Sequence, residues 1–384
     1  MTDYAGLYLH IPFCQAKCTY CSFITGSYED LLAQRYLKAL AAEVRASAAS
    51  LTPAKRSVDT IYFGGGTPSI IAPAALEQLL EVCHECFDVA ADAEITVEMN
   101  PSDIDLARLR SYREMGINRA SVGVQSFIDT QLRAMGRDHS AADAFSAVDK
   151  LRSAGFDNIS IDLIAGLPEQ TLEQWHHNLA QACSLAPEHL SIYLLEIKEG
   201  TTLYAQIRSG QLQTPDEDLA AEMYEMLLDE TAATGYQHYE ISNFARIKSD
   251  QLRYSHHNIK YWLDIPYFGY GVSAHSYNGR ERYWNVKSTH EYITRIEQSG
   301  EAVAERIELS PYDQAREAFM LQLRLMTGVD LANFQIRYGF DLANEYHEEL
   351  VELAAAGLLE TDQGRLRLTR RGILLSNEVF LLFV

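Results

Sequence analysis

Three of the six cysteines in this 384-residue chain, Cys14, Cys18 and Cys21, lie within eight positions of one another. They follow a short apolar run, 6–11, that is typical of a β-strand. The C-x3-C-x2-C spacing predicts three thiolates close enough to hold three corners of an iron–sulfur cubane, a cluster that usually has four cysteine ligands. A fourth thiol could most easily follow at position 23, which is Phe23. One iron would therefore lack a protein ligand and would be open to a small chelating molecule.

A structural zinc site is the alternative interpretation of the same segment. His10 together with Cys14, Cys18 and Cys21 would give a Cys3His set, which Zn²⁺ accepts in tetrahedral geometry. The x3-x2 spacing is less typical of zinc knuckles and favours the cubane. Measuring iron, sulfide and zinc in anaerobically purified protein would decide between the two.

The other three cysteines are expected to be structural. Cys83 and Cys86 lie three positions apart in an amphipathic run, 73–87, so they share one side of a helix. Haem attachment would need a histidine after the second cysteine, and Phe87 stands there. We therefore interpret these two cysteines as helix packing and Cys183 as a buried thiol.

The composition bounds the class of protein. Hydrophobic residues make up 47% of the chain, and 32 basic against 53 acidic residues give a net charge of −21. This predicts a globular protein of more than one domain and disfavours nucleic acid or anionic lipid as the main partner. The first residues lack a basic and apolar leader, no run is long enough to span a bilayer, and clustered cysteines argue against a disulfide scaffold. We expect a cytoplasmic protein.

Short β-rich runs alternate with helical runs over the first half of the chain. Strands are expected at 6–11, 58–63, 94–99, 119–124, 158–164 and 189–195, and helices at 30–49, 73–87, 104–115, 141–154 and 172–185. This alternation predicts parallel βαβ units. Because six units are fewer than the eight of a closed barrel, we expect an α/β fold built on a six-stranded parallel partial (β/α)6 barrel over residues 1–210.

Polar or glycine-rich residues stand at or just beyond the end of each expected strand. The cysteines follow the first, Gly64-Gly65-Gly66-Thr67 the second, and Glu98, Gln125 and Asp162 lie near later ends. Because parallel α/β folds gather ligands at the carboxyl ends of their strands, we expect these residues to meet at one mouth, with the cluster at its rim.

The cysteine spacing, with the flanking His-Ile-Pro-Phe-Cys and Tyr-Cys, resembles the radical S-adenosylmethionine (SAM) superfamily and, over nearly the whole chain, its HemN-like family. The resemblance implies that SAM chelates the open iron of a [4Fe-4S] cluster, and that an electron from the cluster cleaves SAM to a deoxyadenosyl radical. It further implies that Tyr8 and Tyr20 contact SAM beside the cluster, and that Gly65, Gly66 and Thr67 bind its methionine amino end. It also implies that four residues bind one or other of two SAM molecules: Glu98, Gln125, Arg137 and Asp162. From the residues alone, an ion pair or strand-end hydrogen bonds are the less favoured alternative for Arg137 and Asp162.

The segment 211–305 is expected to complete the barrel. A helix is expected at 214–234, a strand at 239–245, an aromatic stretch at 254–262 and a glycine-rich turn at 269–276. Chemistry alone predicts a packed aromatic core with satisfied histidines. However, His257-Asn258-x-x-Tyr261-Trp262 is similar to the H-N-x-x-Y-W pattern of the haem-chaperone branch of the family, which implies haem binding at His257.

The tail, 306–384, has the pattern of a winged-helix-like α+β module. Helices at 312–325 and 342–356 precede two short strands around Asp362-Gln363-Gly364. Such folds often bind DNA, but residues 310–384 carry eleven acidic and seven basic side chains, so we expect a packing or docking module and no nucleic acid. The final apolar residues, 379–384, are expected to bury against this module.

Two functions fit the same machinery. One is a haem chaperone that binds haem and delivers it to haemoproteins, respiratory or membrane-associated, with a reductant protein serving the cluster. The alternative is an oxygen-independent coproporphyrinogen III dehydrogenase, but HemN-type enzymes carry a fourth cysteine where Phe23 stands, and a longer arm before the cluster than the thirteen residues here. The resemblance therefore favours the chaperone, without dehydrogenase activity. A radical SAM enzyme for another substrate, and a second copy of the chain as partner, stay open.

Overall fold

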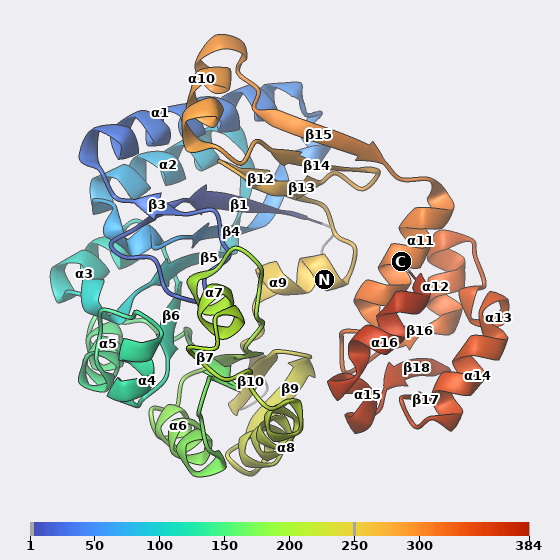
Figure 1. The fold of residues 1–384 in the computed structure, drawn as a ribbon. Helices are drawn as coiled ribbons and strands as arrows, with labels where there is room; N and C mark the ends of the chain where they lie inside the picture. Colours follow the sequence, from blue (N-terminus) through green and yellow to red (C-terminus); the bar gives the residue numbers. More distant parts are fainter. Residues whose placement is uncertain (1–3, 249–250, 384) are drawn as a thin grey trace.

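The computed structural model describes residues 4–248 and 251–383. Six consecutive parallel strands form the centre of its main sheet, and they confirm the six expected strands. They curve into the open arc seen in Figure 1. In spatial order they are β1 (Ala5–Ile11), β4 (Ser57–Gly65), β5 (Asp88–Met99), β6 (Arg119–Gln125), β7 (Ile159–Ala165) and β8 (His189–Leu194).

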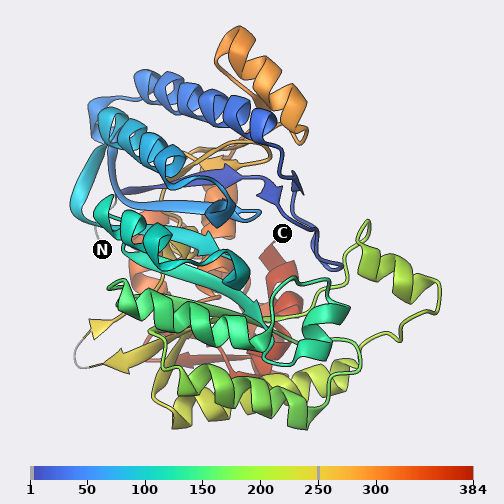
Figure 2. The same ribbon diagram turned by 90° about the vertical axis from the view of Figure 1, so that its left-hand side faces the viewer.

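The connecting helices cover the outer face of this arc, where Figure 2 shows them stacked side by side. They lie close to the expected positions: α1 (Asp30–Ser50), α2 (Pro73–Cys86), α3 (Leu106–Glu114), α5 (Ala141–Ser153) and α6 (Leu172–Ser184). The starts of α5 and α6 are fixed by capping boxes, Ser140 with Asp143 and Thr171 with Gln174. Each helix connects one strand to the next, and such short connections explain why each strand lies beside the previous one.

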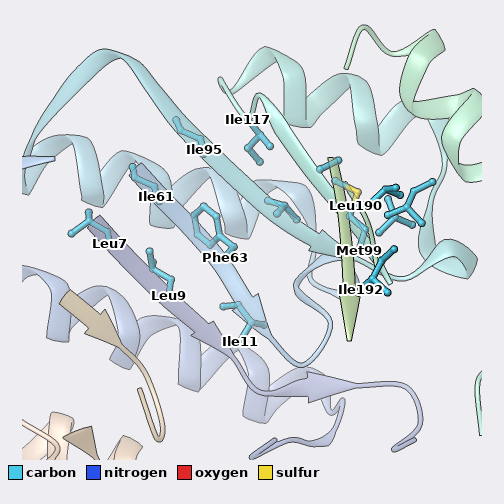
Figure 3. Close-up of a cluster of buried hydrophobic side chains, with 14 of the residues drawn as sticks. Leu7, Leu9, Ile11, Ile61, Phe63, Ile95, Met99, Ile117, Leu190 and Ile192 are labelled. Atoms are coloured by element: carbon cyan, nitrogen blue, oxygen red, sulfur yellow. The ribbon is translucent and has the colours of Figure 1, made fainter. Parts of the chain in front are cut away.

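The two faces of the arc have opposite chemistry, because successive side chains of a strand point to opposite faces. Apolar side chains such as Leu7, Leu9, Ile61 and Phe63 lie beneath the helices and form the core drawn in Figure 3. The alternate positions are largely polar, glycine or tyrosine: Gly6, Tyr8 and His10; Thr60, Tyr62 and Gly64; Glu94, Thr96 and Glu98; Arg119, Ser121 and Gly123; Ser160 and Asp162; His189, Ser191 and Tyr193. The interior of the arc is therefore polar and largely buried, except at positions near the ends of the strands such as Tyr193.

The sheet is longer than the sequence predicted. On one side β12 (Tyr267–Tyr270) runs parallel to β1, followed by antiparallel β13 (His275–Tyr277), β14 (Glu281–Asn285) and β15 (Val303–Glu308). The expected glycine-rich turn at 269–276 was therefore partly wrong, because its first residues belong to β12. Gly271 begins the actual turn with φ +103°, where a Cβ would lie 2.8 Å from the carbonyl oxygen of His10.

On the other side, antiparallel β10 (Asn243–Lys248) follows β8 and pairs with β9 (Tyr236–Glu240) and β11 (Gln251–Leu252). The single strand expected at 239–245 was wrong: the buried carboxylate of Glu240 accepts hydrogen bonds from the Ser242 N–H and the Asn243 side chain, which bends the chain into a hairpin. The preceding helix, α8 (Glu217–Ala233), lies within the expected range 214–234, and it is capped by Asp216, whose carboxylate accepts from the backbone N–H groups of Asp218 and Leu219.

Helix α9 (His256–Trp262) lies inside the arc, against β1 and β4, as Figure 1 shows. The Glu94 carboxylate accepts hydrogen bonds from the backbone N–H groups of His256 and His257 at 3.2 and 3.1 Å. Lys260 donates to the Tyr4 carbonyl at 2.6 Å and pairs with Asp59. These anchors lie near the amino ends of the strands, so α9 closes the barrel at the end opposite the cysteines.

The C-terminal module begins with four helices: α11 (Pro311–Gln322), α12 (Leu331–Tyr338), α13 (Leu342–Glu345) and α14 (His347–Ala355). Its three-stranded sheet has the spatial order β16 (Val329–Asp330), β18 (Arg365–Leu368), β17 (Leu359–Asp362). The module ends with α15 (Arg370–Leu374) and α16 (Ser376–Phe380). The expected hairpin is confirmed, with Gln363 and Gly364 both at positive φ. The single helix expected at 342–356 is interrupted at Tyr346, whose ring packs on Phe383 at 5.2 Å.

The module docks on the rest of the chain through polar and aromatic contacts. The Arg324 guanidinium lies 4.3 Å from the centre of the Trp262 ring, and Arg370 pairs with Glu225 and Asp229. Residues 211–305, by contrast, share one sheet with the first part of the chain, so the three-domain division at 210 and 305 stays a prediction. No helix within 4–248 and 251–383 combines the length and apolarity needed to cross a bilayer.

The final residues pack into the module as expected, apart from Val384, which lies outside the described residues. The buried Phe383 ring contacts Phe319 at 5.0 Å, whereas Leu381 is 68% exposed.

We expect Phe383→Ala to lower the free energy of unfolding by about 3–5 kcal/mol, because it leaves a cavity between packed rings. Leu381→Ala, two positions away, is expected to change it by less than about 0.5 kcal/mol. Urea unfolding of both variants measures the difference, and equal small effects would contradict the docked position of the chain end.

Candidate functional site

A cavity of about 390 Å³ opens at the carboxyl ends of the parallel strands. It is lined by eleven of the thirteen residues singled out from the sequence: Cys14, Cys18, Cys21, Tyr20, Gly65, Gly66, Thr67, Glu98, Gln125, Arg137 and Asp162. Tyr8 and His257 do not line it. The strand ends thus bring together side chains that are up to 148 positions apart in the sequence.

The loop that carries the cysteines is fixed mainly by its backbone. The Gly66 N–H donates to the Ile11 carbonyl at 2.8 Å and the Thr67 N–H to the Phe13 carbonyl at 2.8 Å. Farther along, the Thr19 N–H donates to the Met135 carbonyl at 3.0 Å, and the Thr19 carbonyl accepts from the Leu203 N–H at 2.8 Å. Contacts from three separate parts of the chain therefore set where the three thiols lie.

The glycines of the 64–67 loop permit this close approach. Gly65 has φ +113°, and a Cβ there would lie 2.5 Å from the His10 ring. A Cβ on Gly66 would lie 2.6 Å from the Phe13 carbonyl oxygen, which is backbone and cannot move aside. The close approach of the His10 ring and the Phe13 carbonyl therefore leaves no room for a side chain at either glycine, and this packing holds the cysteine loop against β4.

The three thiols suit a metal cluster better than three free cysteines. All are free and partly buried; Thr67 donates to Cys14 Sγ at 3.6 Å, and Arg137 Nη1 donates to Cys18 Sγ at 3.4 Å. Burial chiefly raises the pKa of both Cys14 and Cys21, and the neighbouring thiols raise it further. Three thiolates side by side therefore need a cationic group between them, which iron supplies in a cubane.

The zinc interpretation finds less support. In this structure both ring nitrogens of His10 are engaged, Nδ1 with the Tyr8 hydroxyl at 3.0 Å and Nε2 with the Ile24 carbonyl at 3.1 Å. His10 is thus unavailable as a fourth ligand. Within 4–248 and 251–383, no three His, Cys, Asp or Glu side chains surround one metal position. A cubane does not require this, because each cysteine binds a different iron.

Arg137 joins the cysteine loop to the cavity wall. Its Nη2 donates to the Gly123 carbonyl and to Asn100 Oδ1, both at 2.7 Å, while Nη1 reaches Cys18. The Asn100 amide in turn donates to Asp138 Oδ1 at 2.7 Å. The sequence missed Asn100 and Asp138 as cavity residues; their places just beyond β5 and beside Arg137 were the available signal.

Two half-buried carboxyl groups face the cavity. Glu98 accepts hydrogen bonds from the Tyr62 hydroxyl at 2.8 Å and the Gly65 N–H at 2.9 Å, yet burial raises its pKa to about 7. Asp162 accepts from the Ser121 hydroxyl at 3.2 Å, and burial raises its pKa to about 6 against the lowering effect of Arg119. Each group can therefore change its charge near neutral pH, and a cationic ligand would favour the ionised forms.

Gln125 and Tyr20 complete the polar wall. Gln125 ends β6 with φ +66°, a left-handed conformation that is uncommon outside glycine and that cavities and ligand sites often contain. The β6–β7 register shifts at the same point, which turns the Gln125 side chain toward the cavity. Burial, ahead of every other effect, raises the pKa of Tyr20 and keeps its hydroxyl neutral.

The mouth of the cavity is apolar on one side. Phe23, Tyr193 and Leu194 line it while remaining 65%, 44% and 38% exposed. The sequence could not separate these side chains from core residues of the same type. Exposed apolar side chains clustered at a cavity mouth are typical of a ligand or partner site.

Tyr8 and His257 lie one layer below the cavity. Tyr8 stacks on Tyr62 with ring centres 6.0 Å apart. His257 is 1% exposed; its Nδ1 is 2.9 Å from the Thr60 hydroxyl and its Nε2 is 2.9 Å from the Tyr261 hydroxyl. Burial lowers the pKa of His257 to about 3, with Lys260 and Arg119 adding to the effect. The ring is therefore neutral and both its nitrogens have partners.

Comparison with known proteins identifies the family to which this chain belongs. A profile of the Radical SAM superfamily matches residues 8–182, and one of the HemN C-terminal domain matches 309–375. The solved structure of coproporphyrinogen III oxidase (HemN) from Escherichia coli, a radical SAM enzyme, superposes with a TM-score of 0.85 at 28% identity, over 99% of this chain and 90% of that one. The chain belongs to the radical SAM superfamily, and the expected partial barrel with its C-terminal module is confirmed.

Curated relatives of this chain show to which family within the superfamily it belongs. Heme chaperone HemW of Bacillus subtilis is 37% identical over 97% of both chains, and Heme chaperone HemW of Lactococcus lactis is 34% identical over 97% of this chain and 95% of its own. A mitochondrial radical S-adenosyl methionine domain-containing protein 1 of Bos taurus is 31% identical over 98% of this chain and 86% of its own. Within the superfamily, this chain belongs to the HemW family.

Because a Cβ on Gly66 would collide with the Phe13 carbonyl, we expect Gly66→Ala to displace the cysteine loop. After anaerobic reconstitution, iron and sulfide per chain should fall to less than about half of the wild-type level, as expected when a ligand loop is mispositioned. Gly26→Ala is the matched control: Gly26 begins β3 (Gly26–Ser27), the short strand that follows the cysteines, and a Cβ there meets nothing within 4 Å. Full iron loading of Gly66→Ala would contradict the tight packing.

Proposed function

We propose that this protein is a haem chaperone that binds haem and delivers it to haemoproteins, respiratory ones among them, and that carries a [4Fe-4S] cluster and a SAM site. One observation carries the proposal. All the residues that the family resemblance assigns to the cluster and to SAM, apart from Tyr8, line a single cavity, in a chain 37% identical along almost its whole length to a Heme chaperone HemW. We place its work in the cytoplasm, with a haemoprotein acceptor at the membrane and a reductant protein for the cluster.

Each part of the cavity has a role in this proposal. Cys14, Cys18 and Cys21 would hold the cluster, which when bound supplies the electron that cleaves SAM in this superfamily. Arg137 offsets thiolate charge at Cys18 and fixes the wall through Gly123. The glycine loop together with Tyr20, Thr67, Glu98, Gln125 and Asp162 would hold SAM. Partial burial of Glu98 and Asp162 lowers the local dielectric constant and strengthens their polar contacts with a bound ligand.

Haem enters the proposal through two features. The H-N-x-x-Y-W segment suggests His257 as a ligand of the haem iron. In this conformation, coordination would require the His257 ring to release its hydrogen bonds to Thr60 and Tyr261. Separately from His257, the exposed Phe23, Tyr193 and Leu194 at the cavity mouth offer an apolar surface on which a flat macrocycle could lie. The acceptor protein would then take haem from an exposed face rather than from a closed pocket.

Coproporphyrinogen dehydrogenase activity is the second candidate, favoured by the structural likeness to HemN. Phe23 opposes it: the side chain stands where HemN-type enzymes carry a fourth cysteine, and it is exposed at the cavity mouth. A second copy of the chain stays open as a partner.

We expect SAM affinity to depend on pH. SAM carries a positive sulfonium and an amino group, so it binds best when Glu98 and Asp162 are ionised; as the pH is lowered through about 7 and then about 6, protonation removes this attraction. Anaerobic equilibrium dialysis should show affinity falling by about tenfold per pH unit below the upper midpoint.

Glu98→Gln should remove the upper step and leave the lower one. S-adenosylhomocysteine, which lacks the sulfonium charge, should show a weaker dependence and serves as the ligand control. A flat profile for the wild-type protein would contradict the role of both carboxyl groups.

We expect haem to bind the wild-type protein and to bind His257→Ala at least about tenfold more weakly, as measured by spectroscopic titration. His177→Ala, an exposed histidine on α6, is the control and should leave affinity unchanged. In an anaerobic assay with coproporphyrinogen III, reductant and SAM, no protoporphyrinogen should form. Robust protoporphyrinogen formation would favour the dehydrogenase instead.

A further inference from the structure

His257 is linked to the cavity wall through one aromatic ring. Its imidazole lies 5.2 Å from the Tyr62 ring, centre to centre, with 31° between the planes. The Tyr62 hydroxyl donates to Glu98 Oε1 at 2.8 Å, and Glu98 Oε2 accepts from the Gly65 N–H at 2.9 Å. Three contacts therefore run from α9 to the glycine loop that anchors the cysteines.

The imidazole is held firmly enough to act as a support. A neutral imidazole has one donor and one acceptor, and the hydroxyls of Thr60 and Tyr261 can serve either. Tyr261 in turn packs edge-on against Tyr267 at 4.5 Å. Anchored at both nitrogens between β4 and α9, the ring cannot rotate without breaking a buried hydrogen bond.

Tyr62 depends on its neighbours for its orientation. Tyr8 stacks on it at 6.0 Å and His257 packs on it at 5.2 Å, while its hydroxyl donates to Glu98. Loss of either ring would leave space into which the Tyr62 ring could turn, and turning would withdraw the hydroxyl from the carboxylate. The rings of Tyr8 and His257 therefore help to fix the position of the Glu98 carboxylate in the cavity, because they hold Tyr62 in place.

We infer that His257 is a positioning residue for the SAM cavity: it supports Tyr62, and through Tyr62 it holds the Glu98 carboxylate against the glycine loop. The inference rests on the proposed SAM site but is independent of any contact between His257 and haem. It gives the H-N-x-x-Y-W segment a role in the conformation that the structure describes, in which the histidine has no free nitrogen.

The test is SAM affinity, measured by anaerobic equilibrium dialysis on reconstituted full-length protein between about pH 5.5 and pH 8.5, a range that spans the carboxyl titrations. His257→Ala and Tyr62→Phe should each weaken SAM binding by about tenfold, the effect of one lost hydrogen bond to a charged group. Both should also move the upper midpoint of the pH profile upward, because Glu98 loses the donor that favours its ionised form.

Three further variants sharpen the result. His257→Gln keeps one donor and one acceptor for Thr60 and Tyr261 and should restore part of the affinity. The double variant His257→Ala/Tyr62→Phe should be no weaker than either single variant, since both act through one contact. His238→Ala removes a half-buried imidazole that stacks on Phe244 at 4.5 Å and does not line the cavity, and it should leave the pH midpoint unchanged.

Several outcomes would overturn the inference. It fails if His257→Ala folds, loads iron and binds SAM with wild-type affinity and midpoint, whether or not haem binding is lost. If His257→Ala does not fold, Tyr62→Phe decides alone, because it removes only a hydroxyl, and an unchanged profile sinks the proposal. A wild-type protein that binds no SAM would reject the proposed SAM site and this inference together, whereas failure of the variants alone rejects only the inference.

Discussion

The buried polar face of the parallel strands is the constraint on which the rest of this structure depends. One face of each strand sits in an apolar core beneath the helices, so the pleat sends the alternate side chains into the barrel interior. A buried polar group without a partner costs roughly 1–3 kcal/mol, and a buried charge more. Many of the interior residues are therefore hydrogen-bonded to one another, as in the pairs Ser121 with Asp162 and Tyr62 with Glu98. A cavity built on such a network keeps its shape before any ligand arrives.

Arg119 illustrates how charge is balanced in this interior. It is 1% exposed, pairs with Glu94 at 3.9 Å, and favours the ionised form of Asp162 while disfavouring protonation of His189 and His257. Glu94 also accepts from the backbone at the start of α9, so one buried ion pair connects the strand that carries Glu98 with the helix that carries His257. The same cation therefore acts on both ends of the barrel interior.

The sequence predicts which residues gather at the carboxyl ends of the strands better than it predicts how far each residue lies below that end. The strand ends identify Glu98, Asp162, the glycine loop and the cysteines as neighbours at one mouth, and the family resemblance adds Tyr8 as a SAM contact. Nothing in the local pattern shows that Tyr8 lies a layer beneath the cavity, or that His257 meets Thr60 across 197 positions of sequence. β12 escaped prediction for a similar reason: Gly269 and Gly271 resemble turn residues, whereas pairing with β1 makes the first of them part of a strand.

The shared fold cannot choose between chaperone and dehydrogenase, because one fold supports unrelated functions and the decision lies in the site. The cysteine loop is held by backbone hydrogen bonds to Ile11, Phe13 and Met135, which leave its side chains free to differ between relatives. Position 23 is such a place: Phe23 is 65% exposed at the cavity mouth and makes that rim apolar where a thiol would have been a metal ligand or a redox group. A rim of this kind suits a protein that must release its ligand to another protein, since an exposed apolar contact can be exchanged without opening the buried network behind it.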